Sequence, residues 1–300
     1  MSETIKLISF QRSLGLVAAE RKGLFADEGL GIEYTQTPSS ATQIRGVLDG
    51  TWDVAQTAAD NVMAYVENEG ADLFVFLVAN LGLGQKLFVQ PEITAYERLR
   101  GKVLVVDALD TGYAYVLQKM LQLNGLGPDS YRFESVGGTP QRLQALRERR
   151  AAGALLSGHP EETALREGFS LLQSASDYFP LYPGDTHATT RRWSEGHGEL
   201  LAGYIRAYLR GCAWAAEPAN RDEGISLIAD DQQVSTEAAA ARYERDRETR
   251  SAEAPSLDEV RAALQVVLDL RWEMAAMPGP RPSPSKYFDP SYWERGVGPS

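Results

Sequence analysis

The 300-residue sequence has few of the residues that build disulfides and metal sites. It contains one cysteine, Cys212, and three histidines, His159, His187 and His197. A single cysteine forms no internal disulfide and no zinc site made of several thiolates, and no two histidines stand at HExxH spacing. We therefore expect no metal and no other cofactor, and interpret Cys212 as a small core residue.

Long apolar runs and a basic surplus are also missing. No stretch approaches the roughly 20 apolar residues that span a bilayer, so we expect no membrane insertion. Lysine and arginine number 30 against 41 aspartates and glutamates, which gives a net charge of −11 at pH 7. Nucleic acids and anionic membrane surfaces attract a basic face. We therefore expect a small-molecule partner and no nucleic acid.

The first residues, MSETIKLISF, lack the basic start, apolar run and cleavage site of a secretory signal. If Met1 is the native start, this pattern predicts a cytoplasmic protein. If a signal peptide was removed, the protein is periplasmic or otherwise extracytoplasmic. The sequence leaves both possibilities open.

Strand and helix patterns alternate through the first part of the chain. Short apolar runs at residues 5–10, 73–78 and 102–106 predict strands, and amphipathic stretches between such runs predict helices. This alternation is typical of an α/β fold with a mostly parallel sheet. From Thr189 onward the pattern becomes all-helical, beginning with one long predicted helix over residues 191–216.

Several sequence blocks resemble a known family. Residues 18–25 (AAERKGLF) and 28–30 (EGL) match the opening A-x-x-x-G-x-F-x-x-x-G-L, and residues 47–54 (VLDGTWDV) match L-x-x-G-x-x-D. Residues 99–103 (LRGKV) match the strand entry L-K/R-G-K-x-V, and residues 189–193 (TTRRW) begin the similar helical part. The chain resembles the SsuA/THI5/NMT1-like group of periplasmic-binding-protein folds.

The resemblance implies a two-lobed α/β fold of the periplasmic-binding-protein type 2 class, with mixed sheets, flanking helices and a helical C-terminal region. One lobe would comprise residues 1–88 and 187–300, and the other residues 92–180. Residues 89–91 and 181–186 would form the crossings. In this family the ligand sits in the cleft between the lobes, which close by hinge motion.

The implied function is binding of a small organic solute, as a substrate-binding-protein-like receptor with an ABC permease as its partner. One alternative is a cytoplasmic enzyme on the same fold, a decarboxylase, hydrolase or lyase acting on a small organic or aromatic acid or a pyrimidine-like substrate. His159 and Asp107 would then be its acid–base groups. A cytoplasmic sensing module is a third possibility. Whether the protein binds or catalyses stays open.

In the first lobe, the candidate ligand-binding residues follow predicted strands. Arg12 either pairs with an acidic group of the ligand or is a solvated surface residue. A histidine near the return crossing, His187, could face the cleft. The full set of candidates in this lobe is Phe10, Gln11, Arg12, Gln56, Thr57 and Asn80.

In the second lobe, the candidates lie where helices begin after strands. Thr111 and Gly112 would present backbone N–H groups at a helix N-terminus. Asp107 and Asp110 would repel an anion, which favours a ligand with a cationic or hydrogen-bond-donating part. His159 is either a structural residue or a ligand contact. The candidates in this lobe are Asp107, Thr111, Gly112, Tyr113, Gly138 and His159.

Overall fold

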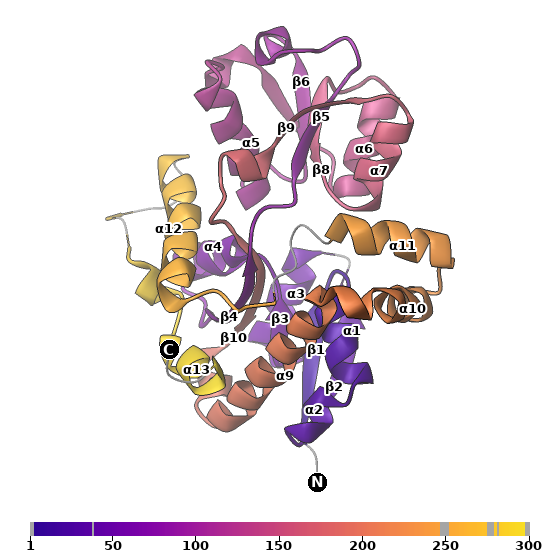
Figure 1. Cartoon of the computed structure of the whole chain (residues 1–300). Coiled ribbons are helices and arrows are strands. Elements are labelled where there is room, and N and C mark those ends of the chain that lie inside the picture. The colour runs from indigo at the N-terminus through magenta and orange to yellow at the C-terminus, as the bar shows by residue number, and fades with distance from the viewer. Residues whose placement is uncertain (1–2, 38, 247–251, 275–278, 281, 298–300) are drawn as a thin grey trace. The chain divides into compact units, whose positions relative to one another are not determined.

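The computed structural model describes residues 3–37, 39–246, 252–274, 279–280 and 282–297. The chain divides into two compact units (Figure 1). Unit 1 consists of Met1–Leu81, Pro183–Leu268 and Met277–Ser300, and unit 2 of Gly82–Tyr182 and Asp269–Ala276.

Unit 1 is built on a five-stranded sheet with the order β2-β1-β3-β10-β4. β1 pairs in parallel with β2 and β3, whereas β10 runs antiparallel to β3 and β4. The apolar run 73–78 forms most of β4 and is fully buried, as expected of a strand covered on both faces. The strands are β1 (Glu3–Ser9), β2 (Leu30–Gln36), β3 (Val54–Gln56), β4 (Phe74–Leu81) and β10 (Pro183–Thr189).

Unit 2 repeats this arrangement with the order β7-β6-β8-β5-β9. β6 is parallel to β7 and β8, and β5 is antiparallel to β8 and β9. The sequence analysis assigned residues up to 88 to the first lobe, but β5 belongs to this second sheet because both its edges pair there. The strands are β5 (Lys86–Val89), β6 (Val103–Val106), β7 (Arg132–Ser135), β8 (Gly153–Leu156) and β9 (Ser170–Ser174).

The predicted long helix over residues 191–216 is in fact two helices. Thr190 caps the short helix α8 by accepting a hydrogen bond from the Trp193 backbone N–H, and α9 begins only after His197. Gly196 lies in the break and has low helix propensity. The α-helices that precede β5 or follow β10 in the chain are α1 (Leu14–Arg21), α2 (Leu24–Asp27), α3 (Ser40–Leu48), α4 (Ala59–Glu69), α8 (Arg191–Ser194), α9 (Gly198–Ala216), α10 (Arg221–Gln232), α11 (Thr236–Arg245), α12 (Leu257–Glu273) and α13 (Pro290–Val297).

Helices α1 and α9 pack closely because glycines lie at their crossing. A Cβ atom on Gly211 would stand 2.2 Å from the carbonyl oxygen of Gly15, and a Cβ on Gly15 would stand 2.5 Å from Sγ of Cys212. Because the atom opposite Gly211 belongs to the backbone, that position requires glycine, whereas a side chain at Gly15 would first have to displace the Cys212 side chain. This contact fixes Ser13, at the start of α1, beside α9.

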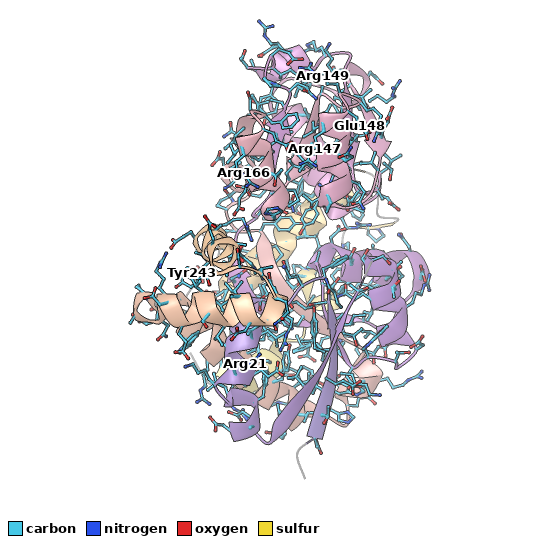
Figure 2. The ribbon with its side chains drawn as sticks, turned by 90° about the vertical axis from the view of Figure 1, so that its right-hand side faces the viewer. Arg21, Arg147, Glu148, Arg149, Arg166 and Tyr243 are labelled. Carbon is cyan, nitrogen blue, oxygen red and sulfur yellow. The ribbon has the colours of Figure 1, made fainter. Side chains whose placement is uncertain are left out.

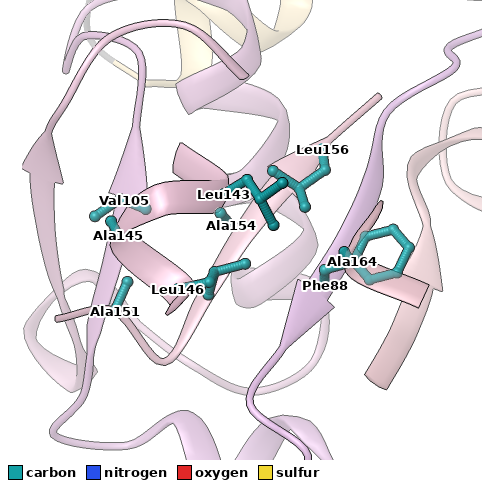
Figure 3. Close-up of a cluster of buried hydrophobic side chains, with 9 residues drawn as sticks. All are labelled: Phe88, Val105, Leu143, Ala145, Leu146, Ala151, Ala154, Leu156 and Ala164. Atoms are coloured by element: carbon teal, nitrogen blue, oxygen red, sulfur yellow. The ribbon is translucent and has the colours of Figure 1, made fainter. Parts of the chain in front are cut away.

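Unit 2 carries α5 on one face of its sheet and α6 and α7 on the other (Figure 1). Its helices are α5 (Gly112–Leu123), α6 (Thr139–Arg147) and α7 (His159–Arg166). Apolar side chains of α6, α7 and the sheet form a buried cluster (Figure 3). The members of this cluster are Phe88, Val105, Leu143, Ala145, Leu146, Ala151, Ala154, Leu156 and Ala164. Such burial is the main stabilising contribution to the unit.

A run of charged residues ends α6 and is solvated (Figure 2). Arg147 pairs with Glu167 at 2.5 Å, and Arg149 pairs with Glu92 at 2.9 Å, with all four side chains well exposed. Exposed pairs of this kind contribute little to stability.

Across the described ranges, no helix is long and apolar enough to cross a membrane.

Candidate functional site

In each sheet, four strands end at one edge, and the one antiparallel strand begins there; we call this the carboxyl edge. Loops and helix starts gather there, which makes it the usual ligand-binding edge of α/β sheets. In unit 1, β1, β2, β3 and β4 end at this edge and β10 begins there. Its segments are residues 9–13, 36–37, 56–60, 80–81 and 183–187.

Asp185 is the centre of a hydrogen-bonded network at the carboxyl edge of unit 1. Its Oδ1 accepts a hydrogen bond from Nε2 of Gln56 at 2.7 Å, and its Oδ2 accepts one from the Tyr208 hydroxyl at 2.6 Å. Nε2 of His187 lies 3.3 Å from Oδ1. The hydroxyl oxygens of Ser13 and Tyr208 are 2.7 Å apart. The network therefore links β3, β10, α9 and the start of α1.

The network sets the protonation of its members. Burial raises the pKa of Asp185, but the charge of His187 and the hydrogen bonds from His187, Tyr208 and Gln56 lower it more, and the resulting pKa lies below the ordinary 3.8. Burial raises the pKa values of the Tyr208 hydroxyl and the Cys212 thiol well above their ordinary values. At neutral pH, Asp185 is therefore charged, and these two groups are neutral.

His187 is fully buried beneath aromatic rings. Its side chain is 0% exposed, and its Nδ1 lies 2.9 Å from the Tyr204 hydroxyl oxygen. The Tyr208 ring stands edge-on to it, with 4.4 Å between ring centroids. The hypothesis that His187 faces a ligand is wrong, because its side chain is fully buried and these rings cover it.

The segment after β1 contains one apolar and one charged candidate. Phe10 is 49% exposed, and Gln11 is exposed, with its carbonyl oxygen accepting a hydrogen bond from Ser9. Arg12 is mostly buried; its guanidinium pairs with Asp231 at 2.8 Å and also with Glu20. Arg12 therefore already forms ion pairs with two carboxylates. Phe10, in contrast, exposes about half of its surface and is the more accessible of these two candidates.

Thr57 and Asn80 lie at the same edge. The backbone N–H of Thr57 donates to the Thr186 carbonyl at 2.9 Å, and its hydroxyl accepts from Asn61 at 3.0 Å. Asn80 of β4 pairs in register with Asp185 of β10, and its Oδ1 is buried with no hydrogen-bond partner in the described structure. Thr57 is thus engaged in holding the fold, whereas Asn80 retains an unused acceptor.

In unit 2, Thr111 caps helix α5 at the carboxyl edge. Its hydroxyl donates to Oδ1 of Asp107 at 2.7 Å and accepts from the Ala114 N–H at 3.3 Å. Gly112 is the buried first residue of α5, and Tyr113 follows it half-buried. Asp107 therefore supports the helix start. Because α5 runs over twelve residues, its N-terminus carries a positive partial charge at this edge.

A buried arginine lies beneath the next helix start. Gly138 is exposed and precedes α6, and Arg142, one turn into α6, is 4% exposed. Its guanidinium donates to the Leu155 carbonyl at 2.6 Å and to the Thr139 hydroxyl at 2.8 Å, while its Nε has no hydrogen-bond partner in the described structure. Burial lowers the pKa of Arg142, and the nearby Asp107 counteracts part of that effect.

His159 begins α7 and is accessible. Its side chain is 74% exposed, with Nδ1 3.5 Å from a carboxylate oxygen of Glu162. Behind it, Lys86 of β5 pairs with the buried Glu161 at 2.7 Å. These contacts leave His159 available to a ligand and give it no buried acid–base partner.

Sequence reasoning missed Asp185, Tyr208 and Arg142. Asp185 falls in a segment interpreted as a crossing, and Tyr208 and Arg142 fall within predicted amphipathic helices. A buried polar side chain in a helix has no local signature, except that long helical side chains point toward the N-terminus, as Arg142 does toward Thr139.

Among the residues that the structure describes, no three His, Cys, Asp or Glu side chains gather as a metal site.

Comparison with solved structures finds the same fold at low sequence identity. The periplasmic aliphatic sulphonate binding protein SsuA from Escherichia coli is 16% identical, with a TM-score of 0.74 over 95% of this chain and 91% of that chain. The periplasmic nitrate-binding protein NrtA from Synechocystis is 13% identical, with a TM-score of 0.79 over 98% and 88%. These matches confirm the predicted periplasmic-binding-protein fold class.

A third similar structure is the ligand binding component of an ABC-type import system from Staphylococcus aureus. It is 12% identical, with a TM-score of 0.80 over 97% of this chain and 98% of that chain. No curated protein sequence matches the chain significantly. A family model described as NMT1/THI5 like matches residues 11–221. Since this match covers more than half of the chain, the protein belongs to the NMT1/THI5-like family.

Proposed function

We propose that this protein is the substrate-binding component of an ABC-type importer and binds a small organic solute. The observation that carries the proposal is the construction of the two carboxyl edges. Each combines buried polar side chains with an exposed apolar one, Phe10 at 49% in unit 1 and Leu109 at 59% in unit 2. Binding sites for small molecules have this mixture of apolar surface and few polar groups.

The similar structures support the same role. Their names describe a sulphonate binder, a nitrate binder and a ligand binding component of an importer. We infer an ABC permease as the partner and an extracytoplasmic location, because an importer receives its solute outside the cytoplasm.

The enzyme alternative has no supporting geometry at its candidate residues. His159 is exposed and contacts residues of its own helix, Glu162 and Thr163. Asp107 accepts a hydrogen bond from Thr111 in a helix cap. A general base needs a partner that positions it for proton transfer, whereas Asp107 is held in a helix cap and His159 contacts its own helix.

A thermal-shift screen tests the proposal. The panel contains sulfonates, aromatic carboxylates, pyrimidines and amines, and each hit is recovered and weighed by mass spectrometry after incubation. A ligand at about 100 times its Kd stabilises the folded state by about 2.7 kcal/mol, which such a screen detects. We expect hits that are recovered unchanged. Chemical conversion of a hit, or no hit in the whole panel, would contradict the proposal.

A further inference from the structure

Strand β7 is an outer strand of the unit 2 sheet. Within the described residues, β6 pairs with one side of β7 and no strand pairs with the other. The backbone N–H of Arg132 donates to the Lys102 carbonyl at 2.9 Å, on the side of β6. Backbone groups of successive residues point to opposite sides of a strand, so the N–H and C=O groups of Phe133 and Ser135 point away from β6. Such a row of outward groups is a template for a further strand.

The other three outer strands are less suited to pairing. β4 is covered, because the Val75 N–H donates to the Tyr287 carbonyl at 2.7 Å and Val75 forms a parallel bridge with Phe288. The pairing of β9 with β5 contains a register shift, which makes that edge irregular. β2 is regular, but its one charged residue is Glu33, so two copies of it gain no pair of opposite charges. β7 is regular and carries both a cation and an anion.

The two charges of β7 lie on one face of the strand. Arg132 and Glu134 share this face because side chains alternate along a strand. Their charged groups are 2.9 Å apart, and their side chains are 71% and 40% exposed. Both can therefore take a second partner. On the opposite face, the centroids of the Tyr131 and Phe133 rings lie 4.9 Å apart.

A second copy of β7 fits this edge in one register. In a two-fold antiparallel pairing centred on Phe133, the outward N–H and C=O groups of this residue meet the same groups of the second copy. Arg132 of each copy then lies opposite Glu134 of the other. A slide of two residues in either direction places Arg132 opposite Arg132, or Glu134 opposite Glu134, and like charges in these positions are destabilising. A slide of one residue sets outward backbone groups against inward ones. Charge and backbone direction therefore select the same register.

We propose that the outer edge of β7 is a self-association surface, at which two copies of the protein join their five-stranded sheets into one sheet of ten strands. The pairing involves residues 131–135 of each copy and is a form of strand addition. Because so few residues take part, the dimer is weak and reversible. This surface is independent of the proposed binding of a solute, and either inference can fail while the other stands.

Sedimentation equilibrium at rising protein concentration tests the inference. At about 50 mM salt and neutral pH, we expect monomers at about 10 µM and a growing dimer fraction toward about 1 mM, as for a small interface. Raising the salt to about 500 mM should lower the dimer fraction, because salt screens exposed charges. A mass that stays monomeric at every concentration would overturn the inference.

Two charge reversals test the register. Arg132→Glu gives the strand two negative charges, and Glu134→Arg gives it two positive charges. Each variant alone should dimerise at least ten times more weakly than the wild type, because like charges then lie opposite each other. An equimolar mixture of the two variants should regain the dimer, with one copy of each. If the variants dimerise as the wild type does, or if the mixture stays monomeric, the proposed pairing is wrong.

The charge effect has two matched controls. The double variant Arg132→Glu/Glu134→Arg restores opposite charges in the same register and should dimerise like the wild type. Arg149→Glu breaks an exposed ion pair with Glu92 outside β7 and changes the net charge by the same amount as Arg132→Glu. It should leave the dimer unchanged. Equal weakening by Arg149→Glu and Arg132→Glu would assign the effect to net charge and exclude the β7 edge.

A backbone variant tests the strand pairing itself. Ser135→Pro removes an outward N–H and leaves the bonds to β6 in place, a position at which an edge strand tolerates proline. It should weaken the dimer at least tenfold. Ser135→Ala keeps the N–H and loses only the side-chain hydrogen bond to the Asp107 carbonyl, so it should dimerise like the wild type. Equal dimerisation of the proline and alanine variants would contradict strand addition at this edge.

Discussion

The two sheets share one strand order, but their carboxyl edges differ in the polar groups that they present. The edge of unit 1 presents amide oxygens and the carboxylate of Asp185, together with the ion-paired guanidinium of Arg12. The edge of unit 2 presents the N-termini of α5 and α6 above a buried guanidinium, that of Arg142. The strand order therefore determines where a ligand edge lies, and side chains from outside the strands determine its chemistry.

Removal of the central carboxylate should have the largest effect on this comparison. Asp185→Leu removes a buried carboxylate and leaves the donors of Gln56 and Tyr208 without their acceptor, and we expect a loss of about 3–5 kcal/mol in the free energy of unfolding. The matched change in unit 2, Asp107→Leu, removes one hydrogen bond from Thr111 and should cost about 1 kcal/mol. Urea denaturation measures both. Equal losses of unfolding free energy in the two variants would show that Asp185 and Asp107 stabilise the protein to the same extent.

Acid should weaken the edge of unit 1 through the same residue. The pKa of Asp185 in the folded state lies below the ordinary 3.8, so its carboxylate stabilises the protein above that pH. This contribution is lost as the pH falls below 3.8 and through the folded-state value. The free energy of unfolding of Asp185→Asn should therefore fall less steeply than that of the wild type between about pH 4 and 2. If the unfolding free energies of the variant and the wild type fall in parallel over this pH range, the pKa of Asp185 is not lowered in the folded state.

Replacement of the buried cation should weaken unit 2 by an intermediate amount. Arg142→Met keeps much of the volume but leaves the Leu155 carbonyl without its donor, and we expect a loss of about 1–3 kcal/mol. Arg150→Met, at an exposed ion pair with Glu148, is the control and should cost less than about 0.5 kcal/mol. A stabilised Arg142→Met would show that the guanidinium is retained for binding and not for folding.

Loss of the helix cap should have the smallest effect. Thr111→Val removes the hydroxyl that accepts from the Ala114 N–H, and such a cap contributes about 1 kcal/mol. Thr111→Ser keeps the hydroxyl and should retain most of the stability. Thermal denaturation of the two variants provides the comparison, and equal melting temperatures would rule out a capping role.

Much of the fold was predictable because local patterns encode it. The apolar run of β4 and the helix start at Thr111 and Gly112 each depend on a few neighbouring residues. The same locality explains the errors. The break at Gly196 was missed because the flanking residues have helical periodicity, and β5 was assigned to the wrong lobe because strand pairing is a long-range property.

The candidate site was only partly predictable for a related reason. Strand ends identified Gln56, Asn80, Asp107 and Thr111 as polar residues at carboxyl edges. Whether such a residue is free to bind depends on partners far along the chain: Arg12, in the segment after β1, pairs with Asp231 of α10.

The sequence by itself determined the α/β class, the family and the edges at which polar residues gather, because these depend on periodicity and short motifs. Only the tertiary structure decided which polar atoms are already bonded. Gln56, Asp185 and Tyr208 come from three elements far apart in the chain, and their hydrogen bonds exist only once β3, β10 and α9 pack together. The balance of donors and acceptors at an edge is therefore a property of the folded chain.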